Sequence, residues 1–362
     1  MIRARPPVWL SCSSRFATLR PGVALAVALL ALALLASTWL LPEDDAPRGM
    51  AMSVDVYAAV VEGLRTGGDY YAVTAQELRA SRAPLHPFPA IRLPTLSVVQ
   101  AALPDLASIL LLIAIAAATG LAWTRRIGGW FDRGPPRITA LFLLAGGMVA
   151  FVQPSLVAFH ELWAGLLIAW SLAIRREDRW VEAVALALCA MVIRETAALY
   201  ALVMLAAALV EGRRREALGW VAALLVFVAV LLLHARAVAM IAGPLDAGSP
   251  GWGGLHGPGL FASAMARSTA LTLLPWWLGG PLAMLALLGW AAAPGPLGAR
   301  AALTFGSYAL AIALFARTDN FYWALAAAPA YLIGMAFLPD AARDLARPLL
   351  DRRRVRVQRI TR

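Results

Sequence analysis

The sequence predicts an all-α, polytopic integral membrane protein with about ten transmembrane helices and a helical first extracytoplasmic loop. Of its 362 residues, 61% are hydrophobic and 15% are charged, and the mean hydropathy is +0.72. A globular chain carries roughly 25% charged residues, so this surplus of apolar surface favours lipid as its solvent. The net charge of +11 comes from arginines without any lysine. They lie in short clusters between apolar runs, which is typical of membrane topology, so no nucleic acid is expected as a partner.

Ten apolar runs mark the expected spans. The first, residues 22–41, is longer than the apolar core of roughly 7–15 residues in a cleaved signal peptide, so we expect an uncleaved anchor. The other nine runs are 106–123, 138–152, 156–174, 181–193, 196–210, 217–241, 270–293, 301–316 and 321–338.

The arginines orient these spans. If the N-terminus is inside and each run crosses the membrane, 23 of the 32 arginines lie in inner segments. Cytoplasmic loops carry such a basic excess, so we expect a plasma (bacterial inner) membrane protein with both termini in the cytoplasm. The expected parts are an N-terminal arm, 1–21, a transmembrane domain, 22–338, with the outer loop 42–97, and an arginine-rich tail, 339–362, that contacts membrane lipid.

Residues 180–210 are expected to form a hairpin of two short helices that meet at Arg194-Glu195. A single long helix would reverse every later segment and place the arginine-rich tail outside. Each short helix has about 14 residues and rises about 21 Å, against a hydrocarbon core of about 30 Å. The tip of the hairpin must therefore face protein or a water-filled cavity. We also expect the side chains of Arg194 and Glu195 to diverge by about 100°, which leaves Glu161 or a lipid phosphate as the partner of Arg194.

The outer loop contains two expected amphipathic helices. Ser53 is placed to cap the first, which ends at Gly67-Gly68, and Asp69 is placed to cap the second, 70–80. Together they are expected to form a lid over a cavity.

Ionisable residues at membrane depth are functional candidates, and in this chain they gather on the outer side. They are Asp55, Arg92, Glu161, Arg194, Glu195, His234, Arg236, Arg317 and Asp319.

The outer loop carries a family resemblance. An aspartate after the first span, Asp55, is followed by Tyr57, by Gly68-Asp69-Tyr70 and by the proline-rich segment 87–94. This order resembles the polyprenyl-phosphate-sugar-dependent glycosyltransferases of the GT-C superfamily, in particular the bacterial mannosyltransferase-like members. Arg194-Glu195 and the segment 317–323 are similar to later features of that superfamily.

The resemblance implies transfer of a sugar from a polyprenyl-phosphate donor to an envelope acceptor hydroxyl at the outer face. A carboxylate must take the proton of the hydroxyl, and Asp55 is the expected base. Arginine suits the phosphate leaving group because its planar fork binds oxygens in pairs. The candidates for the phosphate are Arg92, Arg194, Arg236 and Arg317, and those for the sugar hydroxyls are Glu161, Glu195 and Asp319. The metal-dependent branch of the superfamily uses a divalent ion, but no Asp-x-Asp or Glu-x-Asp pair adjoins Asp55. A divalent metal therefore stays an open alternative that no motif supports, and no metal ligands are assigned.

The same residues also have structural interpretations. Asp55 is equally suited to stabilise the first turn of a helix through the helix dipole. Arg194-Glu195 is alternatively an ion pair that holds the hairpin, and His160-Glu161 an interfacial pair. His234 and Arg236 are alternatively groups that extend to the interface at a helix end.

Three other functions fit the same pattern. The chain is alternatively a transporter or flippase for a lipid-linked sugar, a polymerase- or ligase-like envelope enzyme, or a catalytically silent protein of the same fold. A transporter is expected to have interrupted helices near mid-membrane in both halves. Pro275 and Gly279-Gly280-Pro281 are expected to interrupt one run, and no partner for that interruption is evident.

Overall fold

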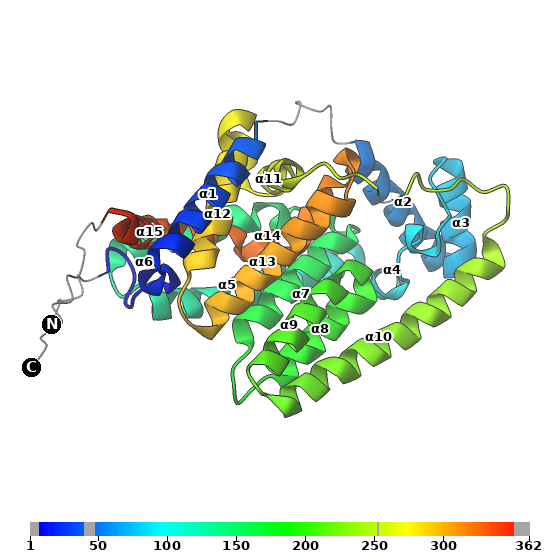
Figure 1. The fold of residues 1–362 in the computed structure, drawn as a ribbon. Helices are drawn as coiled ribbons and strands as arrows, with labels where there is room; N and C mark the ends of the chain where they lie inside the picture. The colour runs from blue at the N-terminus through cyan, green and yellow to red at the C-terminus, as the bar shows by residue number, and fades with distance from the viewer. Residues whose placement is uncertain (1–6, 40–47, 252, 351–362) are drawn as a thin grey trace, which may run out of the picture.

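The computed structural model describes residues 7–39, 48–251 and 253–350, and this part of the chain is helical without a β-strand (Figure 1). The α-helices are α1 (Pro21–Ser37), α2 (Arg48–Arg65), α3 (Tyr70–Ala80), α4 (Thr95–Ala101), α5 (Asp105–Trp130), α6 (Gly134–Met148), α7 (His160–Ile174), α8 (Val181–Ile193), α9 (Ala198–Val210), α10 (Arg214–Ile241), α11 (Pro258–Arg267), α12 (Trp276–Ala292), α13 (Gly295–Phe315), α14 (Ala328–Tyr331) and α15 (Leu338–Leu350). The 3₁₀ helices are η1 (Arg15–Thr18), η2 (Phe88–Ala90), η3 (Val149–Val152), η4 (Pro154–Leu156), η5 (Glu195–Ala197), η6 (Ala270–Leu273), η7 (Thr318–Ala326) and η8 (Leu332–Phe337).

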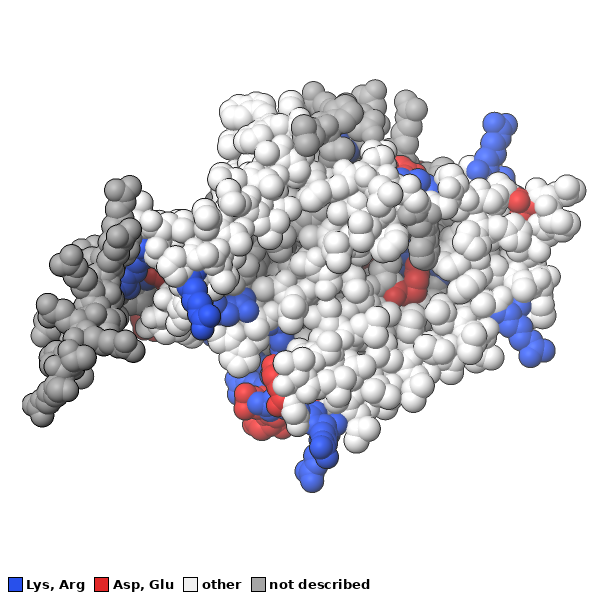
Figure 2. Space-filling view, in the orientation of Figure 1, with Lys and Arg blue, Asp and Glu red and all other residues white. Residues whose placement is uncertain are grey.

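Four helices in the described part are long and apolar enough to cross a membrane: α5, α6 with η3, α10 and α13. A fifth span results if the segments 318–326 and 328–350, which bend by 69° at their junction, count as one. Large apolar side chains point outward along these helices. On α10, Leu225, Leu232 and Leu233 are 65%, 66% and 69% exposed. Most of the face in Figure 2 is uncharged, as expected for a surface in contact with lipid. The chain is therefore a helical, multi-pass membrane protein.

Helix α7 forms the centre of the bundle. Thirteen of its 15 residues are buried, because α5, α8 and η7 pack around it. A helix that is apolar on every side is expected in such a position. The approach of η7 depends on Gly165, where a Cβ atom would collide with the carbonyl oxygen of Leu325.

The predicted hairpin is confirmed as two helices of 13 residues, α8 and α9. The break falls at Arg194, whose backbone is extended at φ −144° and ψ 116°. An ion pair of 2.5 Å between Glu177 and Arg213 joins the connection before α8 to the connection after α9. The two helices therefore run antiparallel, and each rises only about 20 Å.

The predicted outer-loop helices are present, but one boundary is wrong. Helix α2 begins by Arg48, so Ser53 lies inside the helix and does not precede it. The alanine and methionines at 50–52 favour helix and extend α2 toward the N-terminus. The chain leaves α2 through Gly67 at φ +90°, and Asp69 caps α3 by accepting hydrogen bonds from the amides of Tyr71 and Ala72. Both helices group with α4 at one end of α10 (Figure 1).

The expected interruption of the run 270–293 is confirmed at Pro275, which separates η6 from α12, but it is wrong at Gly279-Gly280-Pro281. Pro281 lies within α12 without ending it. Pro281 lies in the second turn and has no amide for the carbonyl of Trp277, four residues earlier. That carbonyl accepts instead from the indole of Trp39 at 3.2 Å.

The two ends of the described chain meet. Buried Asp340, on α15, accepts hydrogen bonds from the amides of Val8, Trp9 and Leu10 at 2.7, 2.8 and 2.9 Å. The first part of the predicted C-terminal tail is thus a helix that packs on the N-terminal arm and on α1.

Candidate functional site

A polar cavity of about 360 Å³ opens between the outer-loop helices, the tip of the α8–α9 hairpin, the α10–α11 connection and η7. The charged residues in its wall are Arg82, Arg92, Arg194, Glu195, Arg317 and Asp319. The two outer-loop helices predicted to form a lid contribute Val56, Tyr57 and Leu78 to the wall. Segments far apart in the sequence therefore meet here.

Glu161 lies behind this wall, in the first turn of α7, and it is 1% exposed. Its carboxylate accepts hydrogen bonds from Arg92 at 2.9 and 3.2 Å and from Nε of Arg194 at 2.8 Å. A carboxylate at the start of a helix is favoured by the helix dipole. The two guanidinium groups share this one carboxylate, so the three buried ions form one unit.

Arg92 is fixed from both outer-loop helices. Its amide donates to the hydroxyl of Tyr57 on α2 at 2.9 Å, and its carbonyl accepts from the hydroxyl of Tyr70 on α3 at 2.7 Å. Its guanidinium lies 4.7 Å from the centre of the Tyr57 ring, within reach of a cation–π contact. Burial raises the pKa of Tyr57, so the phenol keeps its proton. The lid therefore orients Arg92.

Arg194 contacts Glu195 as well as Glu161. The prediction that Glu161 is a partner is confirmed, but the prediction that the side chains of Arg194 and Glu195 diverge is wrong. It assumed helical backbone, and residue 194 is extended instead. The side chain of Arg194 is 8% exposed and that of Glu195 is 19% exposed.

Arg317 and Asp319 lie together in another part of the wall, at the start of η7. Nε and Nη2 of Arg317 donate to the two carboxylate oxygens of Asp319 at 3.0 and 2.7 Å. Arg317 also donates to the carbonyl of Gly251 at 3.2 Å, which ties η7 to the α10–α11 connection. The side chain of Asp319 is 52% exposed, so solvent reaches it.

Two of the predicted site residues lie elsewhere. Asp55 is exposed on α2 and is not part of the cavity wall, although the next two residues, Val56 and Tyr57, are. Arg236 is exposed on α10, also outside the wall. The structure thus brings Arg92, Arg194, Glu195, Arg317 and Asp319 to one cavity, with Glu161 behind them.

The sequence prediction missed Arg82 and Tyr322, which also line the cavity. Arg82 has φ +54° in the turn after α3, a conformation that residues other than glycine rarely adopt. Its position between the end of a predicted helix and Pro84 was a signal for such a turn. No local pattern marks Tyr322, whose position depends on the packing of η7 against α7.

The cavity and the carboxylate behind it combine four guanidinium groups with three carboxylates. Six of these seven groups pair with one another. Arg82 forms no ion pair within the described residues, so one net positive charge faces a space that water can enter. Such a wall can bind a phosphate or the hydroxyl groups of a sugar. Among the residues that the structure describes, no three His, Cys, Asp or Glu side chains cluster as metal ligands.

Comparisons of the chain with protein-family models, with curated proteins and with solved structures gave no match. A fold alone would not define the activity in any case. The functional argument therefore depends on the cavity and its side chains.

Proposed function

We propose that this protein is a GT-C-like membrane glycosyltransferase that moves a sugar from a polyprenyl-phosphate donor to an acceptor hydroxyl at the outer face of the plasma membrane. The observation that carries the proposal is the polar cavity, whose wall combines oriented guanidinium groups with carboxylates that solvent reaches. Arginine binds phosphate oxygens in pairs, and a carboxylate can take the proton of the acceptor hydroxyl. The apolar helices that flank the cavity would let a prenyl chain remain in lipid.

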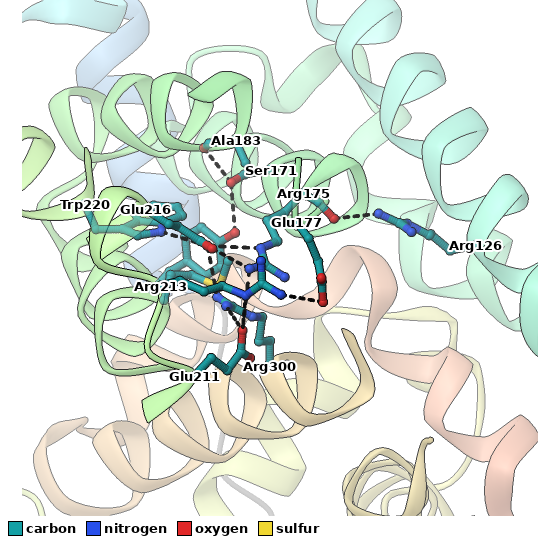
Figure 3. A network of polar contacts seen from close by, with 12 residues as sticks. Arg126, Ser171, Arg175, Glu177, Ala183, Glu211, Arg213, Glu216, Trp220 and Arg300 are labelled. Atoms are coloured by element: carbon teal, nitrogen blue, oxygen red, sulfur yellow. Dashed lines mark hydrogen bonds and ion pairs between the residues drawn. The ribbon is translucent and has the colours of Figure 1, made fainter. Parts of the chain in front are cut away.

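The arginine-rich connections support the proposed orientation. Helix α7 begins at the cavity with Glu161, and Arg175 follows its other end. There Arg175 contacts Glu211 and Glu216, and Arg300 at the start of α13 pairs with both carboxylates at 2.7 and 3.3 Å (Figure 3). The positive-inside rule assigns this end to the cytoplasm and thereby the cavity to the outer face.

The junction of the N-terminal arm with α15 supports an even number of crossings. Because Asp340 holds the amides of residues 8–10, the two ends of the described chain lie on one side. All ten predicted runs contain helix, so ten crossings remain our proposal. Shorter helices such as α8 and α9 would end inside the bundle. Their polar tip, Arg194-Glu195, would there contact Glu161 and the water-accessible cavity.

The proposed roles follow position in the cavity. Among the predicted arginines of the cavity, Arg317 is best placed to take a donor phosphate, because its side chain is 27% exposed and those of Arg92 and Arg194 are 6% and 8% exposed. Buried Arg92 and Arg194 are positioning residues that hold the wall through Glu161. The family resemblance assigns the base to Asp55, whereas position favours Asp319 or Glu195, which line the cavity.

The test uses the full chain in lipid nanodiscs with a polyprenyl-phosphate mannose as donor. Binding of polyprenyl phosphate and release of the carrier are measured for the parent and for the variants Arg317→Gln, Asp319→Asn, Glu195→Gln and Asp55→Asn. Loss of the base is expected to reduce transfer about 10²–10⁴-fold while leaving binding of the carrier, and Arg317→Gln is expected to weaken that binding. Arg236→Gln, which removes an exposed arginine outside the cavity, is the matched control. A folded parent that binds no polyprenyl phosphate would contradict the proposal.

Arg194→Lys separates binding from structure, because lysine keeps the charge but loses the fork. If Arg194 binds phosphate directly, the variant binds the carrier more weakly and melts like the parent. The contacts with Glu161 and Glu195 predict the opposite result. The variant is therefore expected to melt lower and to bind the carrier as the parent does once folded.

One observation favours a second candidate, a transporter or flippase for the lipid-linked sugar. The cavity is lined by Arg194, at one helix break, and by the first part of η7, a segment that ends in the 69° bend. Broken helices at a central site are typical of transporters. In sealed vesicles, a flippase would move the intact donor across the bilayer, whereas a glycosyltransferase would release the carrier phosphate from the sugar.

A further inference from the structure

A second cavity, of about 300 Å³, lies at the arginine-rich end of the bundle, between α5 and the α7–α8 connection. It is distinct from the candidate site, since Glu161 and this connection are at opposite ends of α7. Its wall consists of Ala122, Arg125, Arg126, Ala173, Ile174, Arg176, Arg179 and Glu182.

The wall has an unbalanced charge. It contains four arginines and one carboxylate, Glu182. Within the described part of the chain, none of these four arginines forms an ion pair, whereas the neighbouring Arg175 and Arg213 both do. The positive-inside rule explains why arginines are frequent at this end of the bundle. It does not explain why four of them line one cavity.

Part of the wall is rigid. Arg126 donates from Nε to the carbonyl of Ala173 and from Nη2 to the carbonyl of Arg175, at 2.6 Å each, and the second contact is seen in Figure 3. The amide of Arg176 donates to the carbonyl of Arg179 at 3.0 Å, which closes the turn that carries both residues. Hydrogen bonds to the backbone thus fix the guanidinium of Arg126, and a backbone hydrogen bond fixes the main chain at Arg176 and Arg179. The side chains of Arg125, Arg176 and Arg179 are exposed.

Exposed apolar residues adjoin two of the wall residues in the sequence. Leu121, next to Ala122 on α5, is 54% exposed, and Val181, next to Glu182, is 59% exposed. A ligand with a charged head and apolar chains would place its head among the arginines and its chains along these residues.

We propose that this cavity binds the phosphate group of an anionic phospholipid. Guanidinium groups match phosphate oxygens in geometry and charge, and basic pockets between transmembrane helices on the cytoplasmic side are suited to anionic lipid heads. The site does not depend on the proposed glycosyl transfer, because its residues are separate from the first cavity.

The experiment measures thermal unfolding of the full chain in a neutral detergent, by tryptophan fluorescence. Phosphatidylglycerol, phosphatidylcholine or inorganic phosphate is added in turn. Phosphatidylglycerol is expected to raise the melting midpoint of the parent in a saturable way, and phosphatidylcholine is not. The double variant Arg125→Gln/Arg176→Gln is expected to weaken phosphatidylglycerol binding at least about tenfold, since each basic side chain near an anionic head adds to its binding.

The matched control is Arg214→Gln/Arg215→Gln, which removes two exposed arginines from the same end of the bundle but outside the cavity. It is expected to respond like the parent. Glu182→Gln removes the carboxylate and is expected to strengthen binding, so the proposal remains testable if the double variant is unstable. An equal response of all variants would overturn the site. A rise with inorganic phosphate that matches phosphatidylglycerol would support a phosphate site and overturn its assignment to lipid.

Discussion

The carboxylate of Glu161 lies 2.8 Å from Nε of Arg194, so the first turn of α7 holds the break between α8 and η5. Both side chains are almost completely buried, at 1% and 8% exposure. Arg92 approaches the same carboxylate from the outer loop. One carboxylate therefore joins the lid, the central helix and the tip of the hairpin.

Glu161→Gln is expected to destabilise the protein strongly, because it leaves two buried guanidinium groups without their shared countercharge. Removing one partner of a buried ion pair costs about 3–5 kcal/mol. The measurement is the melting midpoint in detergent. Glu62→Gln is the control, since Glu62 pairs with Arg65 at 3.5 Å but is 69% exposed, and exposed pairs contribute about 0–1 kcal/mol. Similar midpoints for the two variants would show that the Glu161 cluster does not hold the bundle together.

Gly289→Ala is expected to lower the melting midpoint because α12 and η8 touch there. A Cβ atom at Gly289 would overlap the carbonyl oxygen of Gly334, and overpacking costs about 1–3 kcal/mol. Gly306→Ala, in α13, is the control: nothing lies within 4 Å of its added Cβ. Alanine there is expected to stabilise by up to about 1 kcal/mol through helix propensity. Equal effects of the two substitutions would contradict the close contact.

Local signals in the sequence predicted the parts of this fold that depend on few residues. Asp69 caps α3 because its carboxylate reaches amides two and three residues ahead. The break at Arg194 was evident because two apolar runs meet at a charged dipeptide and because the later arginines require a reversal. Because the chain reverses direction at Arg194, the later segments keep their orientation, and several ionisable residues were therefore predicted to lie together on the outer side.

Packing between distant segments could not be predicted in this way. Asp55 and Tyr57 are two residues apart on α2, yet Tyr57 lines the cavity and Asp55 does not, since two residues on a helix point about 200° apart. Which of the two faces inward depends on α3 and η7. The pairing of Arg92 with Glu161 spans 69 residues, and no periodicity encodes it.

The pair of Asp246 with Arg79 makes the outer loop sensitive to acid. Hydrogen bonds from Arg79, at 2.7 Å each, and from the amide of Gly243 hold the pKa of Asp246 well below its ordinary value. Its stabilisation is therefore full above the unfolded pKa of about 3.9 and is lost as the pH falls toward the lower folded pKa. We expect the parent to melt above Asp246→Asn by a constant margin from pH 7 to pH 5, and by a smaller margin below about pH 4.

Asp55→Asn is the control for the loss of an outer-loop carboxylate, since Asp55 is exposed and forms no ion pair within the described residues. At pH 7 this variant is expected to melt close to the parent, because no ion pair is lost. A margin between the parent and Asp246→Asn that grows as the pH falls would contradict the sign of the pKa shift.

The proposed orientation predicts that the outer-loop helices and the N-terminal arm lie on opposite sides of the membrane. Cys12, on the arm, is exposed, and Gln76 is an exposed position on α3 next to buried Ala75. In a Cys189→Ala background, Cys12 is expected to react with an impermeant maleimide only after cells are permeabilised. The Gln76→Cys variant, with Cys12→Ser and Cys189→Ala, is expected to react in intact cells. Both cysteines must react after permeabilisation, which controls for accessibility.

Labelling of Cys12 alone in intact cells would invert the orientation, and labelling of both would mean that the arm and the outer loop share one side of the membrane. The first result would place the polar cavity on the cytoplasmic side, away from the donor sugar of our proposal, and the second would mean that the first apolar run does not cross the membrane.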